Sequence, residues 1–143
     1  MKLEIWTDFC DPFCCLGMKT LRAALVQLGV GQYFDIVMKS YETAPQAGPA
    51  KPLLDSWIET FGYTEDKARR LLTKKLNNRA AKDGLEFDCF KGLVCNTFDA
   101  HRLAKFALEK GVDMTDRLFD ACFRDGLDLS DRSVLKRLAE EAG

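Results

Sequence analysis

The order strand, helix, strand within the first 41 residues constrains the fold more than any other feature of this 143-residue chain. Residues 3–7, LEIWT, alternate in polarity and predict a strand. Asp11 and Pro12 then favour a helix start, and an apolar stripe of helical period continues to a stop at Gly29. Residues 33–41, YFDIVMKSY, predict a second strand. A helical connection makes the two strands parallel, with a right-handed crossover.

Helical patterns dominate the rest of the chain. Residues 43–52, TAPQAGPAKP, hold three of the four prolines and predict a connection. We therefore divide the chain into an N-terminal βαβ part, residues 1–45, and a helical insertion domain, residues 46–143. Residues 85–94 are apolar but interrupted by a glycine, and they fit neither helix nor strand clearly. We expect helices at about residues 53–61, 64–83, 98–110, 115–125 and 132–142.

Composition narrows the class of protein. Hydrophobic residues make up 47% and charged residues 30% of the chain, as in a soluble globular domain, and the formal net charge is −1. This balance gives no reason to expect binding to nucleic acid or to a membrane, and no apolar stretch approaches the ~18 residues of a membrane span. The N-terminus, MKLEIWTD, has no secretory pattern, so we expect a cytoplasmic protein. A mature secreted fragment that begins at an added Met is the alternative.

Two parallel strands are too few for a sheet that stands alone, because parallel sheets are normally larger and covered on both faces. Either the pattern misses strands, or another chain completes the sheet, or the chain stops before the rest of it. An unpaired sheet edge also favours a homo-oligomer. We expect light scattering to detect that association.

The stretch DFCDPFCCLG, residues 8–17, holds three of the six cysteines. A Cys-x-x-Cys motif that ends at Cys14 would need a cysteine where Asp11 stands. Cys10 and Cys14 form an alternative dithiol if their Cα atoms come within ~4.4–6.8 Å of each other. Otherwise Cys10 and Cys15 are small buried apolar side chains, a common state of free cysteine.

Several segments together resemble the DsbA family of thioredoxin-fold oxidoreductases. TDFCDPFCCLGMKTL, residues 7–21, is similar to the active-site segment of the FrnE-like branch, which includes relatives of 2-hydroxychromene-2-carboxylate isomerase. VMKSYETAP (37–45) resembles the second strand of that family, and NTFDAHRLAKFALEKG (96–111) and residues 118–143 resemble its helical insertion. The resemblance covers essentially the whole chain. It implies an α/β, thioredoxin-like fold, with a βαβ unit and an all-helical insertion domain. The resemblance also implies that the thioredoxin-like part is incomplete here, because family members continue into a cis-proline segment, a β-hairpin and a closing helix.

The resemblance also implies roles for the residues of the motif. In this family the first cysteine of the motif attacks a disulfide and the second resolves the mixed disulfide. Asp11 stands in the attacking position, Pro12 follows it, and Cys14 is in the resolving position. We therefore expect a thiol-disulfide oxidoreductase that acts on protein thiols or a small thiol through Cys14, with Cys10 as a possible partner. We expect Asp11 to impair this activity, because the negative charge of an N-cap carboxylate makes a nearby thiolate less stable.

Two other functions fit the same residues. A glutathione-linked isomerase or transferase usually carries a polar residue, often Ser, in the attacking position, and Asp11 is polar but lacks the hydroxyl. The third candidate is a binding protein without catalysis. We expect no tightly bound cofactor, with glutathione as a possible co-substrate. We also expect no metal site, because structural zinc sites prefer two-residue spacings and four ligands.

The remaining cysteines and aromatic residues are predicted to form the core. We expect His101 to be a packed or capping residue rather than a catalytic one. The predicted core residues of the helical part are Cys89, Cys95, Cys122, Trp57, Phe61, Phe106, Phe119 and Phe123.

Overall fold

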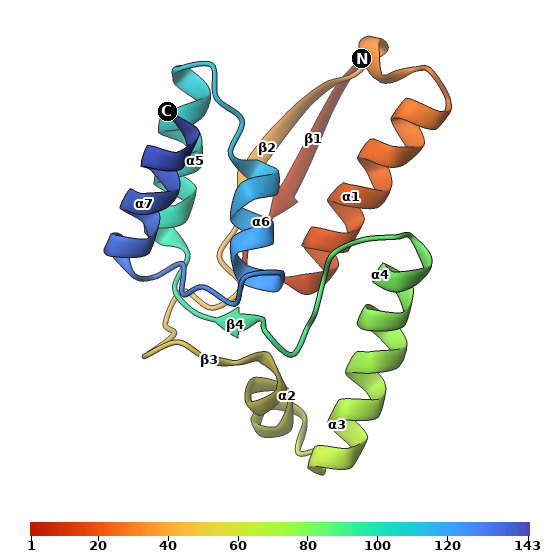
Figure 1. Ribbon diagram of the computed structural model, residues 1–143, viewed down its shortest axis with the longest axis vertical. Helices are drawn as coiled ribbons and strands as arrows, with labels where there is room; N and C mark the ends of the chain where they lie inside the picture. The colour runs from red at the N-terminus through yellow and green to blue at the C-terminus, as the bar shows by residue number, and fades with distance from the viewer.

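The computed structural model describes all residues, 1–143. Strands β1 (Lys2–Thr7) and β2 (Asp35–Ser40) form a parallel pair, and helix α1 (Pro12–Gln27) connects them (Figure 1). The register pairs Lys2 with Asp35 at one end and Thr7 with Ser40 at the other. The predicted βαβ unit is therefore confirmed. Its second strand is shorter than predicted, because residues 31–33 form a turn of 3₁₀ helix.

Asp11 closes the N-terminus of α1, as the sequence predicts. Its Oδ1 accepts hydrogen bonds from the backbone N–H groups of Phe13 at 2.7 Å and Cys14 at 3.0 Å. Pro12 occupies the first helical position, where the helix needs no N–H donor. The helix stops before Gly29, whose φ of 66° strains any residue with a Cβ atom.

Six helices follow β2, and their bounds agree closely with the predicted ones. They are α2 (Leu53–Phe61), α3 (Glu65–Leu72), α4 (Asn78–Lys82), α5 (Phe98–Glu109), α6 (Thr115–Phe123) and α7 (Arg132–Ala142). Helices α3 and α4 are joined by a π-helical turn, Thr73–Asn77, so the single helix predicted for residues 64–83 is continuous but locally widened. Thr64 caps α3 by accepting a hydrogen bond from the Lys67 N–H.

A short antiparallel pair, β3 (Lys51–Pro52) and β4 (Leu93–Val94), was absent from the sequence prediction. Two residues are too few to show an alternating pattern. The segment before β4 is irregular and is held by Asn77, whose side chain donates to Asp88 at 3.0 Å and accepts from the Cys89 N–H at 2.8 Å. Residues 85–94 thus acquire their conformation from the helix beside them.

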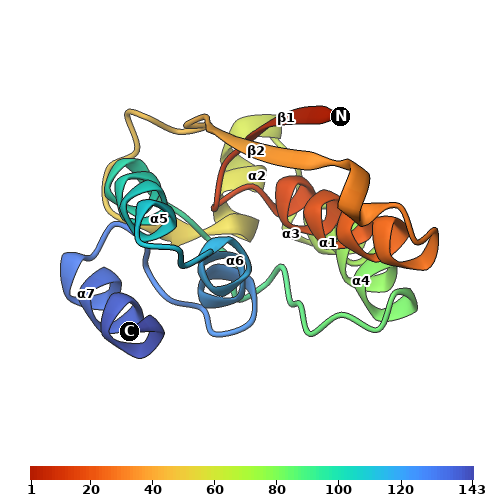
Figure 2. The ribbon, with the colours of Figure 1, turned by 90° about the horizontal axis from the view of Figure 1, so that it is seen from above.

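The helices lie on one side of the parallel pair. Figure 2 shows α1, α5 and α6 on the same side of β1 and β2. The β1 residues alternate accordingly: Ile5 and Thr7 face inwards, whereas Glu4 and Trp6 face outwards, and Trp6 is 66% exposed. The opposite face of the two strands carries no helix.

The predicted core is correct for some residues and wrong for others. Phe119 and Phe123 are fully buried, and so are Cys89, Cys95 and Cys122. Phe61 and Phe106 are 54% and 59% exposed, so their assignment to the core is wrong. Trp57 is only partly buried.

The exposed aromatic residues have local explanations. Phe61 ends α2 and packs on Trp57 and Tyr63 in a small surface cluster, with ring centroids 5.3 and 5.4 Å away.

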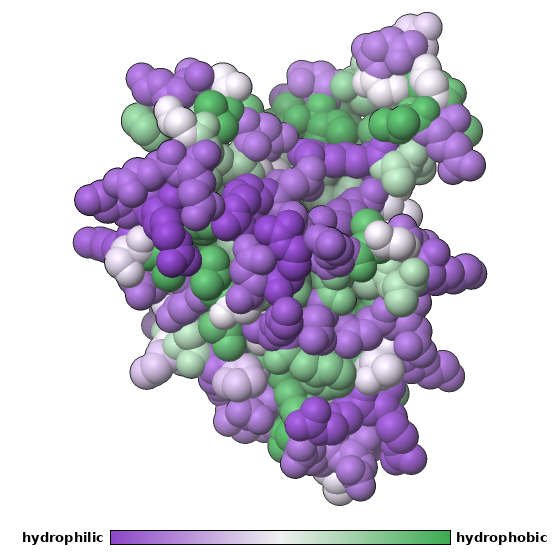
Figure 3. Space-filling view, viewed as in Figure 1, coloured by the Kyte–Doolittle hydropathy of each residue, from purple (hydrophilic) through white to green (hydrophobic).

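Figure 3 shows that hydrophilic residues cover most of one face, with smaller apolar patches between them. No helix has both the length and the apolar character that a membrane crossing requires.

Candidate functional site

The carboxylate of Asp8 lies at the end of β1, where several segments converge. Asp8 is 1% exposed. Its Oδ2 accepts hydrogen bonds from the Thr43 backbone N–H at 2.6 Å and from the Thr43 hydroxyl at 2.7 Å. Its Oδ1 accepts one from the Thr97 hydroxyl at 2.6 Å. One carboxylate therefore joins β1, the loop after β2 and the start of α5.

His101 faces the same carboxylate from α5. Its Nε2 lies 3.5 Å from Asp8 Oδ1 and 3.1 Å from the Tyr41 carbonyl oxygen. Because both neighbours are acceptors, Nε2 must carry a hydrogen. The ring packs on Phe9, with centroids 4.7 Å apart. His101 is 6% exposed, which confirms a packed residue.

The acidity of Asp8 reflects two opposing effects. Burial alone would raise the pKa of its carboxyl group, because it removes the charged form from water. Hydrogen bonds from His101, Thr97 and Thr43 stabilise the charged form more strongly and lower the pKa to about 2. Asp8 therefore stays ionised throughout the physiological range.

Cys14 is the only cysteine that is not fully buried. It lies in the first turn of α1, where the N-terminal end of a helix favours an anion. Even so, the pKa of its thiol is raised, first by partial burial and then by the negative charge of Asp11. Its thiolate is therefore scarce at neutral pH, which limits its reactivity.

Thr7 supports Cys14 from the end of β1. Its hydroxyl oxygen is buried and has no hydrogen-bond partner in the folded protein. A hydrogen bond from this hydroxyl to the sulfur of Cys14 would favour the thiolate, and its proximity lowers the pKa of the thiol. Thr7 is not among the predicted site residues, although its inward position in the alternation of β1 is a usable signal.

Cys10 lies close to a different cysteine from the one considered in the sequence analysis. Its Sγ is 3.4 Å from Sγ of Cys95, and both side chains are buried. No disulfide or hydrogen bond joins Cys10 and Cys14, and all six cysteines are free thiols. Cys15 is also buried, and burial raises the pKa of its thiol to about 12. No three His, Cys, Asp or Glu side chains are arranged to hold a metal ion.

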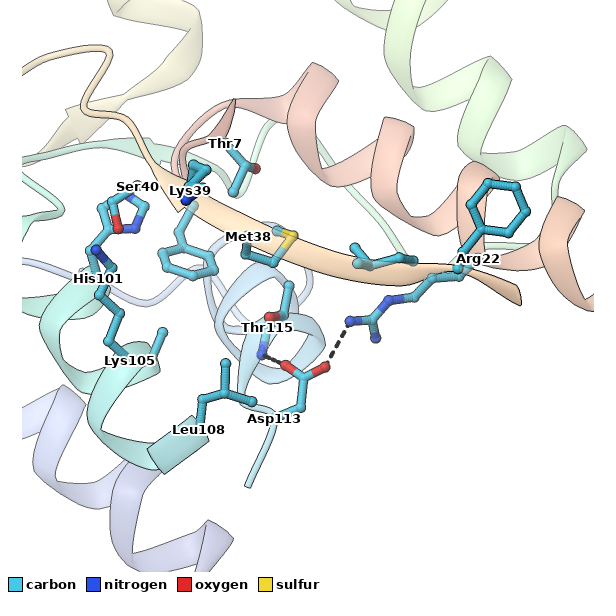
Figure 4. Close-up of a pocket in the computed structure, with 14 residues that line it drawn as sticks. Thr7, Arg22, Met38, Lys39, Ser40, His101, Lys105, Leu108, Asp113 and Thr115 are labelled. Carbon is cyan, nitrogen blue, oxygen red and sulfur yellow. Dashed lines mark hydrogen bonds and ion pairs between the residues drawn. The ribbon is translucent and has the colours of Figure 1, made fainter. Parts of the chain in front are cut away.

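A groove of about 290 Å³ opens beside this site, between β2 and helices α5 and α6. Figure 4 shows Met38 on the strand side and His101, Lys105 and Leu108 on the helix side. Lys39 also lines the groove, whereas Cys14 does not. The groove thus combines an apolar floor with the amino group of Lys105, while the amino group of Lys39 pairs with Glu4, and Thr7 connects the groove to the thiol site.

The structure therefore divides the predicted site residues into two groups. Asp11, Pro12 and Cys14 lie together at the start of α1. Cys10 follows β1 but its thiol contacts the segment after β4. The hydrogen-bond donors to Asp8 are not among the predicted site residues, because Thr43 and Thr97 lie far away along the chain.

The Asp8 carboxylate should make the protein acid-sensitive. Because the folded pKa of about 2 is below the ordinary 3.8, Asp8 stabilises the folded state fully above pH 4. We expect this contribution, about 2 kcal/mol, to be lost as the pH falls from about 4 to 2. Urea unfolding across that range measures it.

Asp8→Asn should be less stable than the wild type at pH 7, with a smaller loss between pH 4 and pH 2. Asp55→Asn, which changes an exposed carboxylate on α2, is the matched control and should follow the wild type. Equal acid sensitivity in the wild type and Asp8→Asn would contradict the assignment.

Comparison with known proteins identifies a family and a solved structure that this chain resembles. Residues 2–143 match the family described as the DSBA-like thioredoxin domain. The crystal structure of a probable DsbA oxidoreductase from Streptomyces coelicolor superposes with a TM-score of 0.90 at 28% sequence identity. The match covers 100% of this chain and 63% of that one, so this chain spans less than two thirds of its relative. No curated protein sequence matches at a significant level.

The TM-score of 0.90 over the whole of this chain means that β1, α1, β2 and the helices after them superpose on that structure as one arrangement. The family match extends over almost every residue, and the structural match covers all of them. The fold is thus thioredoxin-like α/β with a largely helical region after the βαβ unit. The chain belongs to the DSBA-like thioredoxin domain family, a family of thiol oxidoreductase type.

Proposed function

We propose that this protein acts through a single thiol, Cys14, which forms mixed disulfides with protein thiols or with a small thiol such as glutathione. One observation carries the proposal: Cys14 is the only one of six cysteines that reaches solvent, and it lies at the N-terminus of α1. The similar Streptomyces protein is described as a probable DsbA oxidoreductase, which supports thiol chemistry at this position. The motifs at residues 7–21 and 96–111 support the FrnE-like branch.

The proposed reaction begins with the Cys14 thiolate. The thiolate attacks one sulfur of a disulfide co-substrate, so that a new S–S bond to Cys14 forms and the old S–S bond breaks. The leaving sulfur departs as a thiolate. A second, external thiol then attacks the mixed disulfide and releases Cys14. An external thiol is required because Asp11 occupies the position of the first cysteine of the dithiol motif, so the motif offers Cys14 no partner thiol.

Asp11 controls the rate of this reaction. Its carboxylate holds the N–H groups of Phe13 and Cys14, which would otherwise stabilise an anion at the helix end. Its negative charge also raises the pKa of the Cys14 thiol. The protein is therefore a slow thiol reagent at neutral pH and becomes faster in alkali.

Changing Asp11 to Asn should activate Cys14 while retaining a capping side chain. We expect the alkylation rate of Cys14 by iodoacetamide at pH 7.5 to rise by roughly threefold to tenfold, because a pKa decrease of one unit gives a tenfold increase in thiolate. Thr7→Val should have the opposite effect, because it removes the hydroxyl beside the thiol. Mass spectrometry of the labelled peptide measures both rates.

The same measurement includes its control. Asp66→Asn removes an exposed carboxylate on α3, far along the chain from α1, and should leave the rate unchanged. If Asp11→Asn and the control react alike, Asp11 does not govern the thiol.

Restoring a dithiol motif should convert the protein into a better reductant. Asp11→Cys creates a Cys-Pro-Phe-Cys sequence at the start of α1. We expect its rate of insulin reduction with dithiothreitol to exceed that of the wild type by at least about tenfold, because an internal thiol can then resolve the mixed disulfide. Asp11→Ser, which restores no thiol, is the matched variant and should remain slow.

Equal insulin reduction by the wild type and Asp11→Cys would contradict the single-thiol proposal. Inactivity of both proteins, together with no mixed disulfide on Cys14 after incubation with oxidised glutathione, would favour a binding protein without catalysis.

A glutathione-linked isomerase or transferase is the second candidate, and the groove favours it. Lys105 offers an amino group to a carboxylate of glutathione and forms no ion pair with the protein, whereas the amino group of Lys39 is paired with Glu4 at 3.3 Å. Met38, Ala104 and Leu108 offer apolar surface to a second substrate. The groove reaches Thr7, which neighbours Cys14, so a thiol held there lies near the thiol site.

Calorimetry with S-methylglutathione separates binding in the groove from chemistry at Cys14, because this compound has no free thiol. If the second candidate is correct, we expect Lys105→Ala to weaken binding by about threefold to tenfold, as for the loss of a charged contact. Lys110→Ala changes a lysine at the end of α5 outside the groove and should bind like the wild type. No heat of binding by the wild type removes this candidate.

A further inference from the structure

A cluster of buried thiols lies behind the candidate site and is not used by the proposed reaction. It consists of Cys10, Cys95 and Cys122, each at most 3% exposed. Cys10 follows β1, Cys95 follows β4, and Cys122 lies near the end of α6. Three segments from different parts of the sequence thus bring their sulfur atoms together. Free cysteine is often buried as a simple apolar residue, so the geometry of the contacts decides what this cluster can do.

The thiols of Cys10 and Cys95 are in close contact, and the Cys10 thiol is oriented towards Cys95. Their Sγ atoms are 3.4 Å apart, and the Cys10 thiol also points to the Cys95 carbonyl oxygen at 3.5 Å. Cys122 instead donates to the carbonyl oxygen of Leu93 at 3.6 Å. A disulfide bond is ~2.05 Å long, so Cys10 and Cys95 need a small further approach to form one.

A side-chain hydrogen bond next to the two cysteines already holds their segments together. Two residues before Cys10, the Asp8 carboxylate accepts the 2.6 Å hydrogen bond from Thr97, which lies two residues after Cys95. The two contacts therefore pair the segments in an antiparallel sense, 8 with 97 and 10 with 95. A bond between the sulfur atoms would add a second connection between segments that are already adjacent.

We propose that Cys10 and Cys95 form a second redox centre, a reversible disulfide that closes under peroxide and fastens the turn before α1 to the segment after β4. This inference is independent of the reaction proposed for Cys14, because neither Cys10 nor Cys95 takes part in it.

The chemistry balances with hydrogen peroxide as the oxidant. One thiolate attacks a peroxide oxygen, the O–O bond breaks, and the thiolate becomes a sulfenic acid while hydroxide takes up a proton as water. The second thiol attacks the sulfenic sulfur, an S–S bond forms, and the S–O bond breaks with loss of a second water. The two thiols lose two electrons in total, and peroxide gains them.

The surroundings of the two thiols make their oxidation slow. The neighbouring Cys122 thiol raises the pKa of the Cys10 thiol, and burial adds to the rise, although the contact with Cys95 opposes it. The hydrogen bond with Cys10 and burial likewise raise the pKa of Cys95. Few thiolates form, so oxidation is slow, and burial protects the closed disulfide from bulky thiols. Slow closing and slow reopening distinguish this pair from an exposed thiol.

Peptide mapping of the full chain tests the proposal. The protein is treated with hydrogen peroxide until its free-thiol count is constant, alkylated, and digested with trypsin without reduction. We expect a disulfide between peptides 3–19 and 92–102, which contain Cys10 and Cys95. Fragmentation on either side of Asp11 assigns the bond to Cys10 rather than to Cys14 or Cys15. Cys14→Ser should retain the bond, which separates this result from the reaction proposed for Cys14.

Two variants and a stability measurement complete the test. Cys95→Ala should lose the bond, and Cys122→Ala should keep it. The wild type should show a higher thermal midpoint after oxidation, whereas Cys95→Ala should show no increase. A bond from peptide 3–19 to peptide 118–124, which contains Cys122, would overturn the assignment. A wild-type protein whose Cys10 and Cys95 remain free after Cys14 is fully oxidised would overturn the proposal itself.

Discussion

The buried carboxylate of Asp8 is the interaction on which the arrangement of the two parts depends. A charge removed from water is costly unless hydrogen bonds replace its hydration, and Thr43 and Thr97 supply three of them. The donors come from the loop after β2 and from the residue before α5, so satisfying one charge fixes where both segments lie. His101 closes the remaining side and brings α5 with it. The position of β1 relative to the helices thus follows from the requirements of one side chain.

Local patterns predicted most of the elements but few of the contacts between them. The βαβ unit and the helix bounds follow from periodicity, caps and glycine stops, which act over a few residues. Strands β3 and β4 each contain only two residues, and they form because distant segments meet. The same limit applies to the site. The sequence identifies Asp11, Pro12 and Cys14, because they are adjacent, whereas the contact of Cys10 with Cys95 spans 85 residues.

Asp11 shows how one residue can serve structure and oppose chemistry. As an N-cap it satisfies two backbone donors of α1, which stabilises the helix. The same hydrogen bonds withdraw those donors from Cys14, and the charge makes the thiolate less stable. A cysteine at this position would leave the helix end free to stabilise an anion. The replacement therefore exchanges reactivity for a better-capped helix.

The distance in sequence between Asp8 and its donors also has a consequence for how the protein is made. The ribosome releases β1 first, but the hydroxyl of Thr97 and the ring of His101 follow only about 90 residues later. Until then only Thr43 supplies donors to the carboxylate from a distant segment, so its burial would be compensated only in part. The two strands therefore cannot reach their final packing during the first part of synthesis. Contacts between such distant residues also slow folding in general. The emergence of α5 thus marks the earliest moment at which the N-terminal part can become native.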